Sequence, residues 1–332
     1  MQQTILKGLI VFMILSSCKQ NTSENTETQK EEESTTMEVS SQESKPFFKL
    51  SLAQWSLHKA IKSGEMDPKD FAQKASELGF EGIEYVSQLY KEDLKSDPNP
   101  EKAMQQLLET LKSKSEEFNI QNLIIMVDGE GDLAVLDEKE QNETVENHKK
   151  WVDAAQFLGC HSIRVNLFGT NDPEKWVKVS VHGLVKLSEY AASKNVNVIV
   201  ENHGYLSSNA AMLAEVMQKV NKPNCGTLPD FGNFCLERKD GERWSTSCIK
   251  EYPKYQGVEE MMPHAKAVSA KSYDFDSEGN ETTIDYRKML EIIKKAEYTG
   301  FIGVEYEGER LGEIEGITAT RDLLINASKN LN

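Results

Sequence analysis

The chain has 332 residues, carries a formal net charge of -16, and is 38% hydrophobic. Beyond the first few residues it has no block of basic side chains, so a phosphate backbone would be repelled and no nucleic-acid partner is expected. Residues 48–332 are long enough to bury a large core in one domain.

The N-terminus predicts export. Lys7 precedes the apolar run 8–15 (GLIVFMIL), which is too short for a membrane span of about 20 residues and is typical of a signal peptide. The following Leu-Ser-Ser-Cys ends at Cys18 and resembles the lipobox of bacterial lipoproteins. The resemblance implies cleavage of signal peptide 1–17 and acylation of Cys18. An ordinary secretory signal with an incidental cysteine is the alternative.

Residues 18–47 are dominated by Glu, Ser, Thr, Gln and Asn, with no apolar periodicity. Such a segment cannot bury enough surface to offset its ordering entropy, so we expect a disordered acidic linker behind the lipidated cysteine. The protein is then expected on the bacterial membrane, facing the periplasm or the cell surface. Its lipid anchor is its only expected membrane contact.

From residue 48 onward, short β-rich runs alternate with helical patterns, which favours a parallel sheet with right-handed crossovers. Eight such units predict an α/β fold, a single-domain (β/α)₈ barrel. An open doubly wound sheet is the alternative, but the chain lacks the glycine-rich phosphate loop that usually accompanies it. The predicted strands are 49–55, 82–86, 122–127, 162–166, 197–201, 226–230, 265–271 and 301–305.

One long connection follows the sixth predicted strand. Segment 231–255 is polar and aromatic, and its position after a strand predicts a lid or substrate wall over the catalytic face. Cys235 and Cys248 both lie in it and could form a disulfide in an oxidising compartment, although spacing alone does not decide this.

Acidic residues follow the apolar runs of three predicted strands. They belong to the motifs VENHG, PDFGN and GVEYEGE, which contain Glu201, Asp230 and Glu305. Three carboxylates at one barrel mouth would repel each other unless shared protons or a cation held them, so a divalent metal is the simplest explanation. Separate pairing of each carboxylate with a Lys or Arg is the alternative.

In this order and on these strands, the three motifs resemble the sugar phosphate isomerase/epimerase superfamily, the xylose isomerase-like TIM barrels. The resemblance implies that Glu201, Asp230 and Glu305 bind a divalent metal, Mn, Co, Mg or Zn. The family's fourth ligand is a His on the seventh strand, where this chain has Ser269. The metal could be completed by His203 or water, could be weakly bound, or could be absent.

The resemblance further implies proton transfer beside the carbonyl of a sugar, with Glu201 and Glu305 as the catalytic acid/base pair. His203, Lys271, Arg164 and Asn233 would bind substrate hydroxyls, and Trp55 follows the first strand as a stacking surface. We expect a free sugar or sugar derivative as substrate. A keto-sugar lyase acting by β-elimination and a non-catalytic sugar-binding lipoprotein are the alternatives. The sequence leaves the oligomeric state open.

Other polar residues at strand ends are weaker candidates. Glu84, Asp128 and Asn166 could contact substrate or make ordinary polar contacts. His148 lies in a polar helical pattern and is interpreted as a surface residue.

Overall fold

The computed structural model describes residues 45–244, 246–329 and 331. Signal peptide 1–17, Cys18 and all but the last residues of the predicted linker therefore lie outside the described part of the chain. Within the described part, no helix is both long and apolar enough to cross a membrane.

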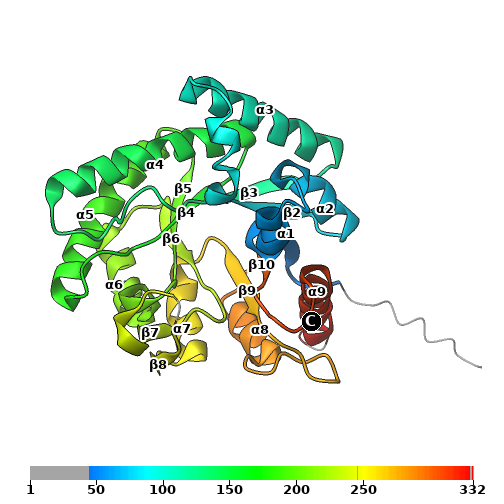
Figure 1. Ribbon diagram of the computed structural model, residues 1–332. Coiled ribbons are helices and arrows are strands. Elements are labelled where there is room, and N and C mark those ends of the chain that lie inside the picture. The colour runs from blue at the N-terminus through cyan, green and yellow to red at the C-terminus, as the bar shows by residue number, and fades with distance from the viewer. Residues whose placement is uncertain (1–44, 245, 330, 332) are drawn as a thin grey trace, which may run out of the picture. The chain divides into compact units, whose positions relative to one another are not determined.

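Eight parallel strands form the centre of the fold (Figure 1). They pair in the order β6-β5-β4-β3-β2-β1-β10-β9. Two parallel bridges, Thr227 to Ala265 and Asp230 to Ser269, connect the two ends of this order, at β6 and β9, and close the barrel. The predicted (β/α)₈ barrel is confirmed. The strands are β1 (Lys49–Ala53), β2 (Gly82–Val86), β3 (Gln121–Met126), β4 (Ser162–Val165), β5 (Asn197–Glu201), β6 (Cys225–Leu228), β9 (Val268–Ser272) and β10 (Phe301–Tyr306).

The helices surround the barrel (Figure 1). Several begin at an Asp or Asn whose side chain accepts a backbone N–H of the first turn, as Asn99 and Asp137 do. The α-helices are α1 (His58–Ser63), α2 (Phe71–Glu77), α3 (Pro100–Glu117), α4 (Glu138–Leu158), α5 (Pro173–Ala192), α6 (Ala210–Val220), α7 (Lys254–Met261), α8 (Tyr286–Lys295) and α9 (Glu313–Ser328). The 3₁₀ turns are η1 (Gln54–Leu57), η2 (Pro68–Asp70), η3 (Ser87–Tyr90), η4 (Asp93–Lys95), η5 (Tyr205–Ser208), η6 (Lys239–Gly241) and η7 (Met262–His264).

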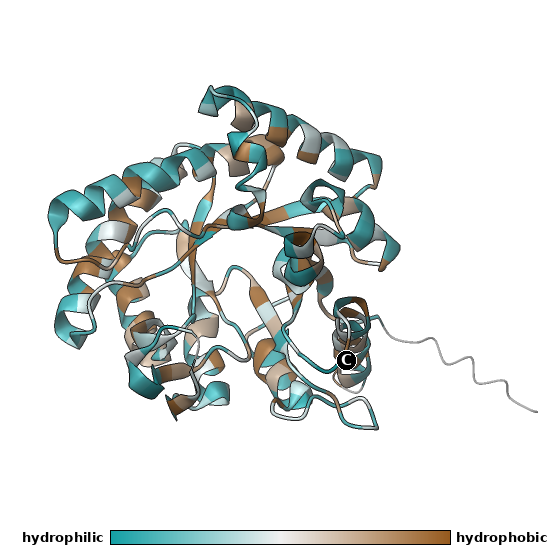
Figure 2. Cartoon of the chain, viewed as in Figure 1, coloured by the Kyte–Doolittle hydropathy of each residue, from teal (hydrophilic) through white to brown (hydrophobic). Residues whose placement is uncertain are grey.

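Apolar side chains form two separate clusters. A large one fills the space between strands and helices, and a small one, which includes Ile124, Ile199 and Leu228, fills the barrel interior. Figure 2 shows the corresponding pattern, with strands mostly brown and helix surfaces largely teal. Because side chains alternate along a strand, residues two positions beyond these interior residues also point inward, at the mouth. Glu201 and Asp230 occupy such positions.

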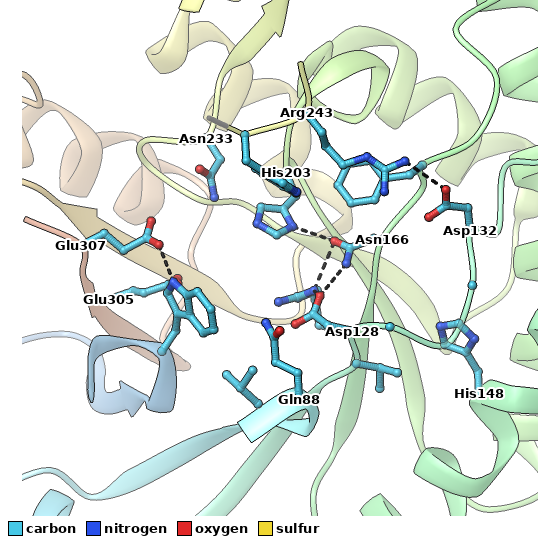
Figure 3. Close-up of a pocket in the computed structure, with 18 of the residues that line it drawn as sticks. Gln88, Asp128, Asp132, His148, Asn166, His203, Asn233, Arg243, Glu305 and Glu307 are labelled. Atoms are coloured by element: carbon cyan, nitrogen blue, oxygen red, sulfur yellow. Dashed lines mark hydrogen bonds and ion pairs between the residues drawn. The ribbon is translucent and has the colours of Figure 1, made fainter. Parts of the chain in front are cut away.

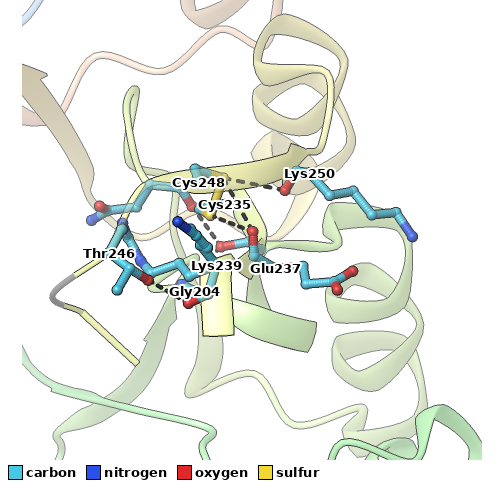
Figure 4. Close-up of a disulfide and its surroundings, with 10 residues drawn as sticks. Gly204, Cys235, Glu237, Lys239, Thr246, Cys248 and Lys250 are labelled. Carbon is cyan, nitrogen blue, oxygen red and sulfur yellow. Dashed lines mark hydrogen bonds between the residues drawn. A yellow bond between two sulfur atoms is a disulfide. The ribbon is translucent and has the colours of Figure 1, made fainter. Parts of the chain in front are cut away.

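The connection after β6 contains a short antiparallel hairpin, β7 (Cys235–Arg238) and β8 (Cys248–Glu251). Cys235 and Cys248 form a disulfide across it, with their Cα atoms 5.8 Å apart (Figure 4). The structure thus decides the pairing that the sequence left open. Cys160 and Cys225 are free thiols.

Candidate functional site

Three buried carboxylates converge at the C-terminal mouth of the barrel. Glu201 ends β5, Asp230 follows β6 and Glu305 lies on β10, and one oxygen of each lies within 4.8 Å of the others. No more than 5% of the surface of any of these three residues is exposed. The carboxylates that the sequence predicted at one site are therefore together.

Glu201 is held from both sides. Its Oε2 lies 3.0 Å from Nε of Arg164 on β4, and its Oε1 accepts a hydrogen bond of 3.0 Å from the Asn233 side chain. Burial raises the pKa of Glu201, although the charges of Arg164 and Lys271 oppose the shift.

Asp230 has donors on both oxygens. The backbone N–H groups of Gly232 and Asn233 donate to Oδ1, at 2.9 and 2.8 Å, and the Ser269 hydroxyl donates to Oδ2 at 2.6 Å. Burial, together with the nearby charges of Glu201 and Glu305, nevertheless raises the pKa of Asp230 to about 7. Ser269 lies 3.2 Å from Oε2 of Glu305 as well, so its hydroxyl joins the two carboxylates.

Lys271 connects Glu305 to a further carboxylate. Its Nζ lies 2.9 Å from Oε1 of Glu305 and 2.8 Å from Oε2 of Glu307. Trp55, in η1, donates its indole N–H to the other oxygen of Glu307. Burial alone would raise the pKa of Glu307, but Lys271 and Trp55 bring it down to about 2, so Glu307 is ionised.

Glu84 on β2 lies deeper in the barrel. Ser51 donates to its Oε1 at 2.7 Å, whereas its buried Oε2 has no hydrogen-bond partner among residues 45–244, 246–329 and 331. Gly303 makes room for it, because a Cβ there would meet the Glu84 carboxyl group at 2.5 Å. Burial raises the pKa of Glu84 to about 8, with Glu305 and Glu201 adding to the shift. Glu84 is thus mainly protonated at neutral pH.

A polar chain runs from His203 to Arg164. His203 donates from Nδ1 to the side-chain oxygen of Asn166 at 2.7 Å, and Asn166 donates to Asp128 at 2.7 Å. Arg164 donates to the same Asp128 oxygen at 2.9 Å. Burial and the Arg164 charge lower the pKa of His203 to about 4, so the ring is neutral and its Nε2 is an acceptor.

A cavity of about 610 Å³ opens above the carboxylates. Its walls include four of the predicted substrate-binding residues (Trp55, Arg164, His203 and Asn233) together with Glu305. Figure 3 shows Glu305 and Glu307 at one end, with His203 and Asn166 beside the middle. The other predicted site residues, Glu201, Asp230 and Lys271, are buried beneath this lining.

The donor set fits a divalent metal ion. Six carboxyl groups lie in or beside the site, and two cationic side chains, Arg164 and Lys271, balance part of their charge. The carboxyl groups belong to Glu84, Asp128, Glu201, Asp230, Glu305 and Glu307. The pKa values of the three converging carboxylates are raised, mainly by burial, so protons or a cation must compensate their charge. Glu201, Asp230 and Glu305 could hold such a metal, with the Ser269 hydroxyl as a neighbouring oxygen.

Several residues that line the cavity were not predicted from the sequence. His148 on α4 is 2% exposed and lines the cavity, so its interpretation as a surface residue was wrong. Arg243 and Trp244, on the hairpin, also line it, and Arg243 forms an ion pair of 3.0 Å with Asp132. The aromatic composition of segment 231–255 was the one available signal for the hairpin residues.

Solved structures with the same fold are numerous. The zinc-bound IolI protein matches with a TM-score of 0.61 at 16% identity, over 85% of this chain and 98% of that one. The 3-keto-D-glucoside 4-epimerase YcjR from E. coli matches with a TM-score of 0.60 at 14% identity, over 78% of this chain and 94% of that one. A D-psicose 3-epimerase from Clostridium cellulolyticum H10 matches with a TM-score of 0.57 at 14% identity, over 85% of this chain and 96% of that one. No curated protein sequence matches the chain.

The sequence itself matches a family model, described as xylose isomerase-like TIM barrel, over residues 72–327. This range runs from α2 to α9 and includes all of the converging carboxylates. The chain belongs to the xylose isomerase-like TIM barrel family.

Proposed function

We propose that the protein is a sugar isomerase or epimerase that moves a proton at a carbon beside a carbonyl group. The observation that supports this most is the placement of Glu305, a buried carboxylate with a raised pKa, in the cavity wall. A carboxylate base works best when its pKa approaches the working pH. Family membership and the epimerases of this fold support the same reaction class.

In this proposal Glu305 and Glu201 form the acid/base pair. Glu305 faces the cavity, whereas Glu201 lies behind Arg164 and Asn233 and must be reached between them. Glu307 is ionised and paired with Lys271, so it orients Lys271 and Trp55 rather than exchanging protons.

The remaining residues position the sugar. His203 offers an unprotonated Nε2 to a substrate hydroxyl, because its Nδ1 proton is already donated to Asn166. Arg164 and Asn233 can donate hydrogen bonds to substrate oxygens from the cavity wall. Trp55 lies in the cavity wall beside Glu307, where its indole can pack against a sugar ring next to the stacked His58 ring at 4.5 Å and the Lys62 ammonium at 4.3 Å.

We further propose that Glu201, Asp230 and Glu305 hold a hard divalent ion, Mg²⁺ or Mn²⁺ in preference to Zn²⁺ or Co²⁺. Ser269 replaces the nitrogen ligand of the family, and in the described part of the chain the converging ligand atoms are carboxylate oxygens with the Ser269 hydroxyl beside them. A bound ion would act as a Lewis acid that stabilises negative charge on the substrate oxygen.

Hydrogen exchange with solvent tests the reaction class. The purified chain is incubated in D₂O with a panel of aldoses, ketoses and keto-glycosides, and deuterium at the sugar carbons is followed by NMR. We expect incorporation beside the carbonyl, lost in Glu305→Gln and retained in the control Glu309→Gln, whose side chain is 87% exposed. An unsaturated product would identify a lyase instead. No exchange and no conversion across the panel would refute the proposal.

We also propose export and lipid anchoring at Cys18. The apolar run 8–15, the residues before Cys18 and a disulfide on the barrel support this, because disulfides persist in oxidising compartments. In cells fed a labelled fatty acid, the wild type should incorporate label and Cys18→Ser should not. Equal labelling of both proteins would contradict the proposal.

A further inference from the structure

The cavity is longer than the reaction centre alone requires. Figure 3 shows Glu305 and Glu307 at one end, and Asp132 and Arg243 at the other. The cavity volume of about 610 Å³ exceeds what one six-membered sugar ring fills. The end away from the carboxylates, formed by Phe168, Asp132, Arg243 and Trp244, is called the outer end below.

The outer end is a built aromatic surface. The Trp244 ring lies 5.5 Å from the Phe168 ring and 4.7 Å from the His203 ring. Arg243 stacks over Phe168 at 4.4 Å and forms an ion pair of 3.0 Å with Asp132. These contacts position the Trp244 ring, yet 47% of this residue remains exposed. An indole face held open in a cavity wall suits a sugar ring.

The hairpin that carries Trp244 is tied down on both sides. Its disulfide joins β7 to β8 (Figure 4), and Arg238 donates to the Thr246 carbonyl at 2.8 Å. Tyr205, after β5, donates its hydroxyl to the carbonyl of Gly241 at 3.2 Å. A two-stranded hairpin alone is marginally stable, so these links are what hold Trp244 at the cavity.

The charge of the outer end argues for a neutral ligand. Arg243 is already paired with Asp132, and the guanidinium of Arg238 is engaged by the Thr246 carbonyl. The Arg243 guanidinium is therefore compensated within the outer end, whereas Arg238, further along the cavity wall, keeps its positive charge and further N–H groups. The reacting ring has its own stacking surface at the other end, Trp55, so the proposed chemistry does not use Trp244.

We propose that the outer end is a second sugar subsite, so that the substrate is a glycoside of at least two rings. The reacting ring lies between Trp55 and the carboxylates, and the next ring stacks on Trp244. The assignment of the reacting ring rests on the proposed function, whereas the outer subsite makes its own binding prediction.

Binding to the full chain tests the subsite. Isothermal titration compares each two-ring sugar with its one-ring counterpart: cellobiose with methyl β-D-glucoside, maltose with methyl α-D-glucoside, and lactose with methyl β-D-galactoside. At least one two-ring sugar should bind about tenfold more tightly than its counterpart. Trp244→Ala should remove this difference, and because its ring also lies 4.7 Å from that of His203, the one-ring Kd of each variant is the reference for the comparison. Trp244→Phe should retain most of it.

Ile249→Ala is the matched control, because Ile249 lies on the same hairpin, is 59% exposed and is outside the cavity wall. It should bind every sugar as the wild type does. The proposal is overturned if each two-ring sugar binds with the same affinity as its one-ring counterpart, or if no two-ring sugar binds. It is also overturned if Trp244→Ala weakens both members of a pair equally. A Trp244-dependent preference without hydrogen exchange would refute the proposed reaction and keep the subsite. Hydrogen exchange without a preference for two-ring sugars would keep the proposed reaction and refute the subsite.

Discussion

Lys271 and Glu305 face each other across neighbouring strands, with Nζ 2.9 Å from Oε1 and both side chains buried. The register of β9 and β10 sets this pair directly, because Lys271 is the Cα partner of Glu305. The same Nζ lies 2.8 Å from Glu307. One cation therefore determines the charge of the cavity-facing base and of the carboxylate that orients Trp55.

Removing this cation should strongly destabilise the barrel. Lys271→Met leaves the buried Glu305 and the partly exposed Glu307 without their counter-ion, and breaking a buried pair such as Lys271–Glu305 from one side costs about 3–5 kcal/mol. Urea denaturation measures the change in the free energy of unfolding. The matched control is Lys59→Met, which breaks the exposed pair with Glu309 and should cost no more than about 1 kcal/mol. Equal costs for the two variants would show that Lys271 carries no special role.

Metal binding should stabilise the folded protein. An ion bound only in the folded state adds about 2.7 kcal/mol at a concentration of 100 times its Kd, which thermal unfolding detects. We expect Mg²⁺ or Mn²⁺ to raise the Tm of the wild type, and Asp230→Asn to abolish the increase. Asp132→Asn is the control, because Asp132 lines the outer end of the same cavity and pairs with Arg243. An increase that survives Asp230→Asn would place the metal elsewhere.

The sequence predicted the barrel and its carboxylates for a physical reason. A parallel strand inside a barrel is a short apolar run, and a charged residue directly after it marks the strand's mouth end. Glu201, Asp230 and Glu305 all follow this rule. Lys271 was also found, since it is two residues from Ser269 and shares its face.

The outer end of the cavity could not be predicted in the same way. Arg243 and Asp132 are 111 residues apart, and nothing in either local pattern indicates that they meet. His148 lies three residues after Val145 and three before Trp151 on the buried face of α4, but a polar side chain at such a position does not by itself indicate that it lines a cavity. Such contacts depend on how long loops fold over the mouth, which local sequence patterns do not encode.

The pH dependence of stability should reveal the buried carboxyl groups. Burial raises the pKa of Asp230 to about 7 and that of Glu84 to about 8, above the ordinary values of 3.8 and 4.5. The folded protein then binds more protons than the unfolded chain, so metal-free stability should fall as the pH rises through 7 and 8. His203 and Glu307, with pKa values of about 4 and about 2, act in the opposite direction but only below about pH 6.5.

Urea unfolding in the presence of a chelator, from about pH 6.5 to 8.5, isolates this effect. Glu84→Gln replaces the protonated carboxyl group with a neutral group of similar shape. Its stability relative to the wild type should increase across this range, because Gln has no proton to lose. A parallel pH dependence in the two proteins would show that Glu84 is not protonated in the folded state.

The disulfide should determine whether the hairpin stays closed. Without it, Cys235→Ser/Cys248→Ser retains the hydrogen bonds of β7 and β8 and the side-chain contacts of the hairpin, but local opening is favoured by up to about 3 kcal/mol of chain entropy. Trypsin should then cut after Arg243, whereas the wild type should resist at this site. Cys225→Ser controls for loss of a thiol, because Cys225 is free and lies at the start of β6. Identical digestion of the double variant and the wild type would mean that the contacts of Arg243 with Asp132 and Phe168 hold the hairpin without the disulfide.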